Sequence, residues 1–250
     1  MIQQLMKYKE QEFEERANKI YGVVTALVTN TKDPDKKGRV KIKYAWMGEA
    51  KAIESDWARV VSFMAGNGRG AHFLPDVDDE VLVAFEHGNI NYPYIVGALW
   101  NGKDKVIEEN ADGKNNIKMI KSRSGHKITL DDTDGKEKFI IEDKSEKRTI
   151  TFDVKKKELT IGNDEADGKI IVKAKGNVEI SSDKKIDIKG KSEISIKSDG
   201  DVSIEGKNVN IKSKAGVKLT AGSSLNAKSS AGMDLKAGST LNLKASASAK

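Results

Sequence analysis

The sequence contains no cysteine, only three prolines and few aromatic residues among its 250 positions. The lack of cysteine excludes a disulfide framework and thiol chemistry. No run approaches the roughly 18 consecutive apolar residues of a membrane-spanning helix. The first residues, MIQQLMKYKEQEFEERANK, lack the apolar core of a signal peptide and resemble a short helical arm. Stability must therefore come from packing and strand pairing alone.

The scarce residue types are distributed unevenly along the chain. The last aromatic residue is Phe152 and the last arginine is Arg148. All prolines and tryptophans lie within the first 100 residues, at Pro34, Pro75, Pro93, Trp46, Trp57 and Trp100. This shift predicts two architectures, a globular domain with an aromatic core followed by a repetitive, polar array.

Charge does not indicate a nucleic-acid partner. The 44 basic residues are nearly balanced by 38 acidic ones, which leaves a formal net charge of +6 and a pI of about 9.1. The two signs are interspersed, which is typical of a solvated surface. We expect no nucleic acid to be bound.

The most informative pattern is a pair of apolar residues at i and i+2 that returns every eight residues, with one step of seven between Val202 and Val209. Fixed-period repetition is the signature of repeat architectures. The expected core residues of this array are Val178, Ile180, Ile186, Ile188, Ile194, Ile196, Val202, Ile204, Val209, Ile211, Val217, Leu219, Leu225, Met233, Leu235, Leu241 and Leu243.

Each repeat predicts a short strand with one narrow apolar face, because residues i and i+2 point to the same side of a strand. Glycines between the pairs supply the turns. The period of eight, the β-branched residues and the glycines argue against an amphipathic helix. Two buried aliphatic side chains per repeat stabilise less than the ordering of eight backbone units costs, so one chain cannot close this core. Several chains wound together can.

Before these octads the repetition is slower. Its pairs are spaced by nine to eleven residues and are separated by charged turns such as 144–147. This spacing predicts a wider, looser first section that narrows into the regular array. The pairs are Ile128/Leu130, Phe139/Ile141, Ile150/Phe152, Leu159/Ile161 and Ile170/Val172.

Residues 20–104 are expected to form a small β-barrel. Pro34 and Gly38 suit a tight turn between the first two strands, and we expect all three tryptophans to have core roles. Five strands in about 80 residues, without a long helix, favour an OB-type barrel. The expected strands span residues 19–29, 39–46, 57–63, 80–85 and 92–100.

No motif indicates catalysis, a cofactor or a metal. The glycines of 66–70 are followed by neither a helix nor a Lys-Ser/Thr pair, so a barrel loop is expected there rather than a phosphate site. Residues 131–135 and 163–168 fail the ligand spacing of a calcium loop and are expected to be turns. His72, His87 and His126 share no metal-ligand spacing.

Several barrel motifs occur in a recognisable order. They are Gly38-Arg39-Val40, Trp57-Ala58-Arg59-Val60, Ala65-Gly66, Gly70 to Phe73, Pro75, Asp79-Glu80-Val81 and Trp100-Asn101. In order and spacing they resemble the OB domain of contractile-injection spike proteins, namely the valine-glycine repeat (Vgr) spikes of type VI secretion and the baseplate assembly protein V of phage tails. Ser124-Gly125-His126 before Leu130-Asp131-Asp132 resembles the start of that family's triple-stranded β-helix.

The chain departs from the family pattern at three points. Asp78 replaces the usual glycine before Asp79, and aspartate tolerates a left-handed backbone better than most residues. About 20 residues precede the barrel, so we expect the hub to be a separate protein. About 25 residues separate Trp100 from His126, too few for the lysozyme domain of some phage spikes, so no enzyme is expected.

The predicted fold class is therefore all-β, with an N-terminal OB-fold barrel followed by an intertwined trimeric β-helix, or β-prism. The expected domains are an arm over residues 1–19, the OB-fold domain over 20–104, a linker over 105–125 and the triple-stranded β-helix over 126–250.

The resemblance implies a structural role, the central spike of a phage tail, tailocin or type VI-like device that pierces a target envelope. It implies a homotrimer, a hub protein at the OB-domain end and a PAAR-repeat tip protein at the other end. Tip binding is expected at Leu241, Leu243, Ala245, Ala247 and Ala249.

We expect assembly in the bacterial cytoplasm, incorporation into the tail or injection particle, and transient contact with the target membrane on firing. The alternative is an OB-fold nucleic-acid or carbohydrate binding module carrying an oligomerising stalk. That alternative requires exposed stacking aromatics with basic neighbours on the barrel.

Overall fold

The structure is a computed structural model that describes residues 2–4, 6, 7, 9, 19–47 and 54–244. The chain divides into two units, Met1–Lys173 and Ala174–Lys250. The described residues of the expected N-terminal arm are helical between positions 2 and 9, and residues 10–18 lie outside the described part.

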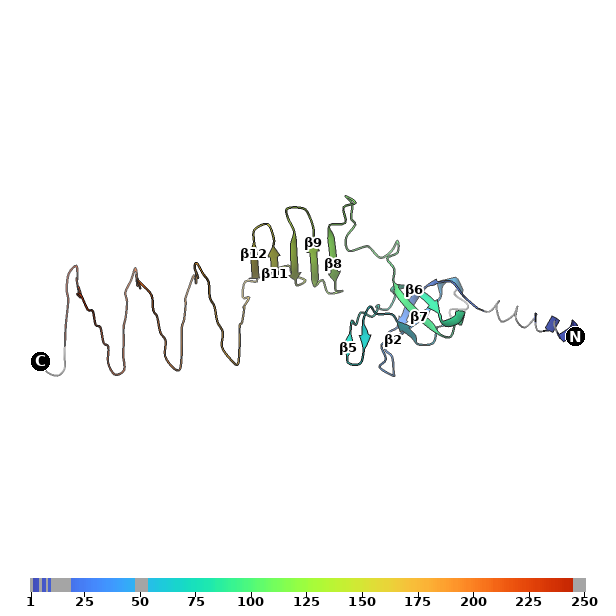
Figure 1. The fold of residues 1–250 in the computed structure, drawn as a ribbon, viewed down its shortest axis with the longest axis horizontal. Coiled ribbons are helices and arrows are strands. Elements are labelled where there is room, and N and C mark those ends of the chain that lie inside the picture. Colours follow the sequence, from blue (N-terminus) through green and yellow to red (C-terminus); the bar gives the residue numbers. More distant parts are fainter. Residues whose placement is uncertain (1, 5, 8, 10–18, 48–53, 245–250) are drawn as a thin grey trace. The chain divides into compact units, whose positions relative to one another are not determined.

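Five strands of the first unit close into a barrel in the order β1-β2-β3-β7-β6 (Figure 1). The pair β3–β7 is parallel, and the other neighbours are antiparallel. The closed barrel confirms the predicted OB-like fold of this segment. Its strands are β1 (Val24–Asn30), β2 (Arg39–Lys43), β3 (Ala58–Val60), β6 (Glu80–Phe85) and β7 (Pro93–Ala98).

The barrel core follows from the alternation along each strand, which sends every second side chain inward. On β2, Val40 and Ile42 are fully buried, and on β6 the same is true of Val81 and Val83. The hydroxyl of Tyr44 is buried without a hydrogen-bond partner, and burial raises its pKa to about 12. The complete core consists of Ala26, Val28, Val40, Ile42, Tyr44, Ala58, Val81, Val83, Phe85 and Ile95.

The three tryptophans do not belong to this core, so the prediction of core roles for them is wrong for the single chain. The alternation that buries Tyr44 ends there, because the 3-10 helix η1 (Ala45–Met47) turns the backbone and leaves Trp46 53% exposed. Trp100 follows the end of β7 and is 65% exposed. Trp57 is partly exposed.

Two turns of the barrel have the expected backbone. Gly38 has a φ of +69°, a left-handed conformation that glycine adopts without strain. Asp78 has a φ of 75°, which confirms that aspartate adopts the conformation for which the family uses glycine. The Asp78 N–H donates to the Val28 carbonyl at 2.9 Å, and this bond ties the turn to β1.

The glycine-rich loop is a small hairpin rather than a featureless loop. Strands β4 (Ala65–Gly66) and β5 (Arg69–Gly70) pair across the two residues Asn67 and Gly68. Gly68 has a φ of +65°, a left-handed backbone that glycine adopts without strain. No helix follows the hairpin in the described residues up to Phe85, so it lacks the geometry of a phosphate-binding loop.

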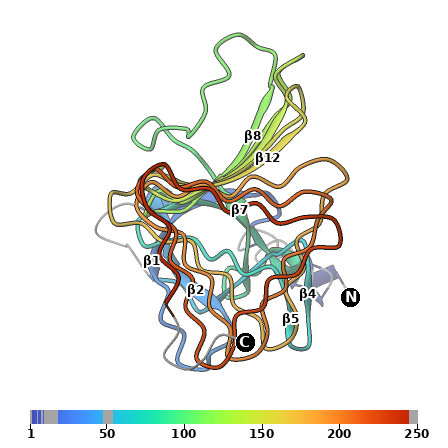
Figure 2. The same cartoon turned by 90° about the vertical axis from the view of Figure 1, so that its left-hand side faces the viewer.

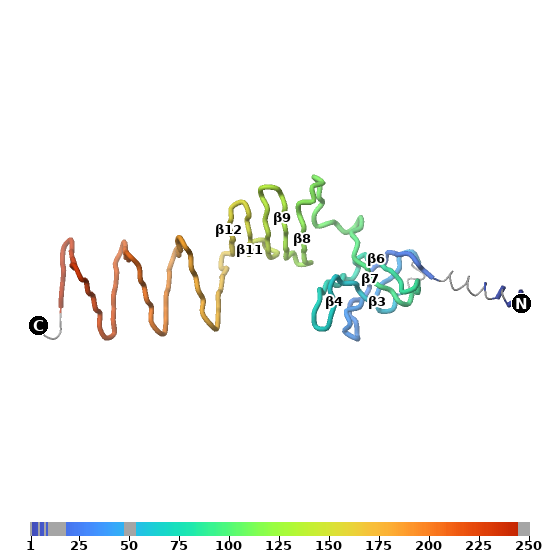
Figure 3. The backbone as a smooth tube through the Cα atoms, viewed as in Figure 1, coloured from blue at the N-terminus to red at the C-terminus, as the bar shows by residue number. Residues whose placement is uncertain are grey.

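A five-stranded antiparallel sheet follows the barrel in sequence, in the order β12-β11-β10-β9-β8 (Figure 3). Consecutive strands are neighbours, so the sheet is a simple meander completed within one chain. β8 falls in the segment 105–125 that the sequence suggested as a linker. The strands are β8 (Ile117–Lys121), β9 (Lys127–Asp131), β10 (Lys138–Glu142), β11 (Arg148–Asp153) and β12 (Glu158–Asn163).

Residues 164–244 contain no regular helix or strand. Within the second unit the chain reverses direction repeatedly, and in the end-on view its successive passes overlie one another, so it winds around one axis (Figure 2). No ladder of paired strands joins these passes within the described residues. The predicted triple-stranded β-helix is therefore not formed by one chain, and it is considered below as a proposal.

Candidate assembly interface

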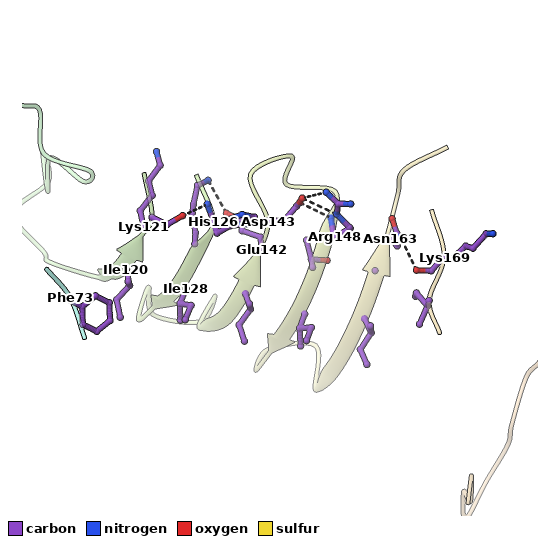
Figure 4. Close-up of a pocket in the computed structure, with 18 residues that line it drawn as sticks. Phe73, Ile120, Lys121, His126, Ile128, Glu142, Asp143, Arg148, Asn163 and Lys169 are labelled. Carbon is purple, nitrogen blue, oxygen red and sulfur yellow. Dashed lines mark hydrogen bonds and ion pairs between the residues drawn. The ribbon is translucent and has the colours of Figure 1, made fainter. Parts of the chain in front are cut away.

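The register of the meander sheet aligns the isoleucines of the sequence repeat. Ile128 lies opposite Ile141, Ile141 opposite Ile150, and Ile150 opposite Ile161. Ile120 on β8 extends the row from the other side of Ile128. One continuous row of isoleucines therefore crosses all five strands on one face of the sheet, and Figure 4 labels two of its members, Ile120 and Ile128.

A second apolar row runs parallel to the first. Leu130, Phe139, Phe152 and Leu159 lie opposite one another across β9 to β12. The rings of Phe139 and Phe152 are in contact, with centroids 5.5 Å apart. Four of the five slower-repeat pairs therefore share one face of the sheet. The fifth, Ile170/Val172, lies in the irregular segment, because a turn over residues 164–168 follows the end of β12.

This apolar face, the two rows just described, is exposed in the single chain. In the isoleucine row the exposed fraction rises from 37% for Ile150 near the centre to 61% for Ile161 at the edge, and Phe139 of the second row is partly exposed. A soluble chain rarely presents a contiguous apolar surface of this kind without a partner. The face therefore has the properties of an interface that is not filled by the chain itself.

The opposite face carries most of the charged side chains of the sheet, together with Met119 and Ile140 in the middle of their strands. Lys127 and Glu142 lie directly opposite each other and form an ion pair of 3.0 Å. Lys138 reaches Asp153 at 3.5 Å across the next pair of strands. The carboxylates of Glu146 and Glu142 raise the pKa of Lys127. Opposite charges placed across a strand pair stabilise the sheet, so these charged side chains have partners within the chain.

The charged turn between β10 and β11 is closed by Asp143. Its carboxylate accepts hydrogen bonds from the Ser145 hydroxyl at 2.8 Å and from Nε of Arg148 at 3.0 Å. The Arg148 guanidinium also pairs with Asp143 through Nη2, and this pairing is the main reason why the pKa of Asp143 is lowered. The turn is thereby held by hydrogen bonds and an ion pair within the chain.

The octad pairs of the second unit are also unburied. Among the residues expected to form a core, the exposed fraction ranges from 49% for Ile186 to 81% for Leu243. No member is buried within this chain. The octad pairs and the apolar face of the sheet therefore share one property, apolar side chains at strand-like spacing that lack an intrachain partner.

Serine side chains mark alternate bends between the octads, which sequence reasoning missed. The Oγ atoms of Ser198, Ser213 and Ser229 accept the backbone N–H of Gly200, Gly216 and Gly232 at 3.0–3.2 Å. Such short serine turns satisfy a backbone donor locally. The signal was present in the sequence as a serine two or three residues before a glycine, at intervals of 15 or 16 residues.

The structure brings together no constellation typical of catalysis or metal binding in its described residues, which contain no group of three His, Cys, Asp or Glu side chains suited to a metal ion. Residues 131–135 and 163–168 include turns, as expected. No helix in the described part of the chain is long and apolar enough to cross a membrane. Of the expected tip-binding residues, Leu241 and Leu243 are exposed, and Ala245, Ala247 and Ala249 lie outside the described residues.

An exposed tryptophan with free basic neighbours could bind nucleic acid, so the surroundings of Trp57 test that possibility. Arg39 and Lys41 lie 5.9 and 5.6 Å from the Trp57 ring centroid. Both cations are already paired, Arg39 with Asp33 at 2.7 Å and Lys41 with Glu54 at 2.7 Å. Acidic partners on both cations disfavour the binding of a phosphate backbone at this ring.

Acidic side chains also surround Trp100. It lines a shallow cavity together with three carboxylates and Lys105, the carboxylates being those of Asp79, Glu80 and Asp104. The neighbours of this exposed ring thus carry mostly negative charge, which disfavours nucleic-acid binding there as well.

Comparison with known proteins identifies the barrel. Residues 24–100 match the family model described as the type VI secretion system/phage-baseplate injector OB domain. A stretch of 102 residues is 34% identical to the type VI secretion system spike protein VgrG5 of Pseudomonas aeruginosa, covering 38% of this chain and 13% of that protein.

Two further relatives extend the match. The spike protein VgrG4b of the same organism is 29% identical over 134 residues, 49% of this chain and 17% of its own length. The spike protein VgrG3 of Vibrio cholerae is 26% identical over 113 residues, 43% of this chain and 11% of its own length. The chain therefore spans less than a fifth of the length of these relatives.

Proposed function

We propose that this chain, whose barrel belongs to the type VI secretion system/phage-baseplate injector OB-domain family, is one of three identical subunits of a rigid spike in a contractile injection machine. The role is mechanical rather than enzymatic. Contraction of the machine would drive the spike through the envelope of a target cell.

The observation that carries this proposal is that one chain contains both this barrel and a long array of octad pairs whose side chains are not buried. The spacing of each octad pair would place its two side chains on one side of a strand, and no member of a pair is buried within the chain. Three chains wound around one axis would bury these pairs against one another and would pair the backbone groups that the single chain leaves without a strand ladder. The number three comes from the family resemblance.

The meander sheet supports the same assembly in a different way. Its strands are already paired within the chain, so only its apolar face needs a partner. Three such sheets, one from each chain, would form the walls of a prism whose interior holds the isoleucine row. Residues 105–125 would then be a linker that includes the first wall strand, β8.

Partners at the two ends complete the proposal. The barrels would rest on a separate hub protein, and a PAAR-repeat tip protein would cover the end formed by residues 241–249. An uncapped end would leave strand edges and the side chains of Leu241 and Leu243 facing water. Removal of residues 240–250 should abolish binding of the tip protein, and a pull-down in which the truncated spike retains it would exclude this part of the proposal.

A paired substitution tests the function in the assembled machine. Ile196→Asp would place three carboxylates around one axis, whereas Lys197→Asp alters the neighbouring, outward-facing position. We expect the first variant to abolish delivery into target cells and the second to retain it. Equal delivery by the two variants would contradict the inward assignment of Ile196.

The binding-module alternative receives less support. It requires an exposed aromatic platform with available basic neighbours. Trp57 has basic neighbours, but both form ion pairs with acidic residues. A salt-dependent shift in the electrophoretic mobility of a labelled oligonucleotide, caused by the isolated barrel, would support the alternative.

A further inference from the structure

The second unit is divided by charge into two parts. Residues 174–205 carry six lysines and seven acidic residues, a formal charge of −1. Residues 206–244 carry seven lysines and a single acidic residue, Asp234, a formal charge of +6. We refer to residues 206–244 as the basic segment. The near-neutral balance of the whole chain conceals this change of sign along its length.

Six of the seven lysines of the basic segment are expected to point away from the proposed core. A side chain at an odd offset from an apolar pair lies on the opposite side of a strand. Lys218, for example, lies between Val217 and Leu219, and Lys212 follows Ile211 directly. Six lysines have this outward parity, namely Lys212, Lys214, Lys218, Lys228, Lys236 and Lys244, and all are exposed.

Little negative charge is available to neutralise them. The one ion pair among the described residues of the segment joins Lys236 Nζ to Asp234 Oδ2 at 3.7 Å, with both side chains more than 80% exposed. Association of three chains would not change this balance, because each chain adds the same seven lysines and one aspartate. The trimer would carry a charge of +18 over this length.

We propose that the basic segment binds the phosphate-rich surface of an anionic phospholipid bilayer. Lysine is a compact point charge that attracts phosphate without a fixed geometry. The segment has no arginine for bidentate contacts and no aromatic residue on which an unpaired base could stack. The attraction is therefore diffuse and electrostatic, and it suits a surface of many phosphates rather than one ligand.

The symmetry of the shaft favours a bilayer over a nucleic-acid duplex. Three identical chains would place lysines on every side of the column, so that headgroups could surround it. A duplex would contact one side and leave the other lysines unused. This inference rests on the proposed trimeric shaft, and it adds a surface that would hold the spike against a membrane before or during penetration.

Vesicle binding by the full chain tests the inference. We expect the protein to co-sediment with phosphatidylcholine vesicles that contain about 30% phosphatidylglycerol and not with pure phosphatidylcholine vesicles. Binding should weaken as salt rises from about 50 to about 300 mM, because screening shortens the reach of the charges. Light scattering on the same sample reports whether the protein is a trimer, so failure of the proposed assembly is distinguished from failure of this inference.

Two matched variants locate the surface. The first variant replaces four lysines of the basic segment by glutamine, namely Lys212, Lys214, Lys218 and Lys228. It should bind the anionic vesicles about tenfold or more weakly than the unaltered protein. The control neutralises four lysines of the first part, Lys184, Lys185, Lys189 and Lys191, and should remain within about twofold of the unaltered protein.

Three results would overturn the inference. They are equal binding to both kinds of vesicle, equal losses in the two variants, and tighter binding of a short DNA duplex than of anionic vesicles at the same salt concentration. If the first variant failed to assemble, the lipid and salt dependence of the unaltered protein would still decide the question.

Discussion

Ile141 and Ile150 lie directly opposite each other on β10 and β11, although eight residues and a charged turn separate them in the sequence. Both side chains are more than a third exposed in the single chain. They lie near the centre of the isoleucine row, so strand pairing aligns these two side chains but leaves them uncovered.

A charge at the centre of this row should prevent assembly. Ile150→Asp would bury three unpaired carboxylates in the proposed interface, and we expect a loss of at least about 3 kcal/mol per chain. Thr151→Asp, on the polar face, should change stability by no more than about 1 kcal/mol. Thermal unfolding and light scattering measure both effects, and similar losses in the two variants would refute the assignment of the faces.

The two units should differ in their ability to fold alone. A fragment of residues 1–173 should retain the barrel and the meander sheet, because their strand ladders are complete within the chain. Residues 174–250, expressed without the rest, should be unfolded at concentrations too low for association. Amide hydrogen exchange distinguishes these states. Protected amides in a monomeric fragment of residues 174–250 would show that this unit closes its own core.

Asp33 should stabilise the first barrel turn in a pH-dependent manner. Its carboxylate, 3% exposed, accepts hydrogen bonds from Arg39 Nε at 2.9 Å and Nη2 at 2.7 Å. The Arg39 side chain is the main reason why the pKa of Asp33 lies below its usual value. This stabilisation is complete above the unfolded pKa of about 3.9 and is lost as the pH falls through the lower folded pKa.

Asp33→Asn should therefore lower the melting temperature at about pH 7, and its difference from the unaltered protein should shrink below about pH 3. Asp35→Asn is the control, because that side chain is 53% exposed and its ion pairs are open to water. An effect of Asp33→Asn that does not change with pH would show that the charge is unimportant.

Asp78 carries a backbone cost that glycine would remove. The backbone φ at Asp78 is 75°, a value that glycine adopts freely and that valine strongly disfavours. Asp78→Gly should therefore be neutral or stabilise the barrel by up to about 1 kcal/mol, and Asp78→Val should destabilise it by more than about 1 kcal/mol. Chemical denaturation measures the free energy of unfolding of each variant. Equal stabilities of the glycine and valine variants would indicate that the turn relaxes.

The sequence predicted much of the barrel because its strands alternate and its turns carry strong signals. The expected strand over residues 80–85 coincides with β6. The expected left-handed backbone at position 78 is present. The failure at Trp46 has a local cause, since the alternation was extended past Tyr44 into a 3-10 helix whose start carries no distinct sequence signal.

The apolar rows of the sheet were likewise visible as pairs in the sequence, but β8 was missed. Its isoleucine, Ile120, precedes Ile128 by eight residues, so the repeat did extend further back than its pairs suggested. The partners of the octads could not be derived from one chain, because the residues that would cover them belong to other copies. The octad residues therefore form a core only if several copies of the chain assemble.

The molar mass of the full chain in solution, measured by light scattering at micromolar concentration, tests this dependence most directly. The proposed assembly predicts one species of three times 27.4 kDa that persists on dilution, because its core exists only between chains. A folded, stable species of 27.4 kDa would contradict it.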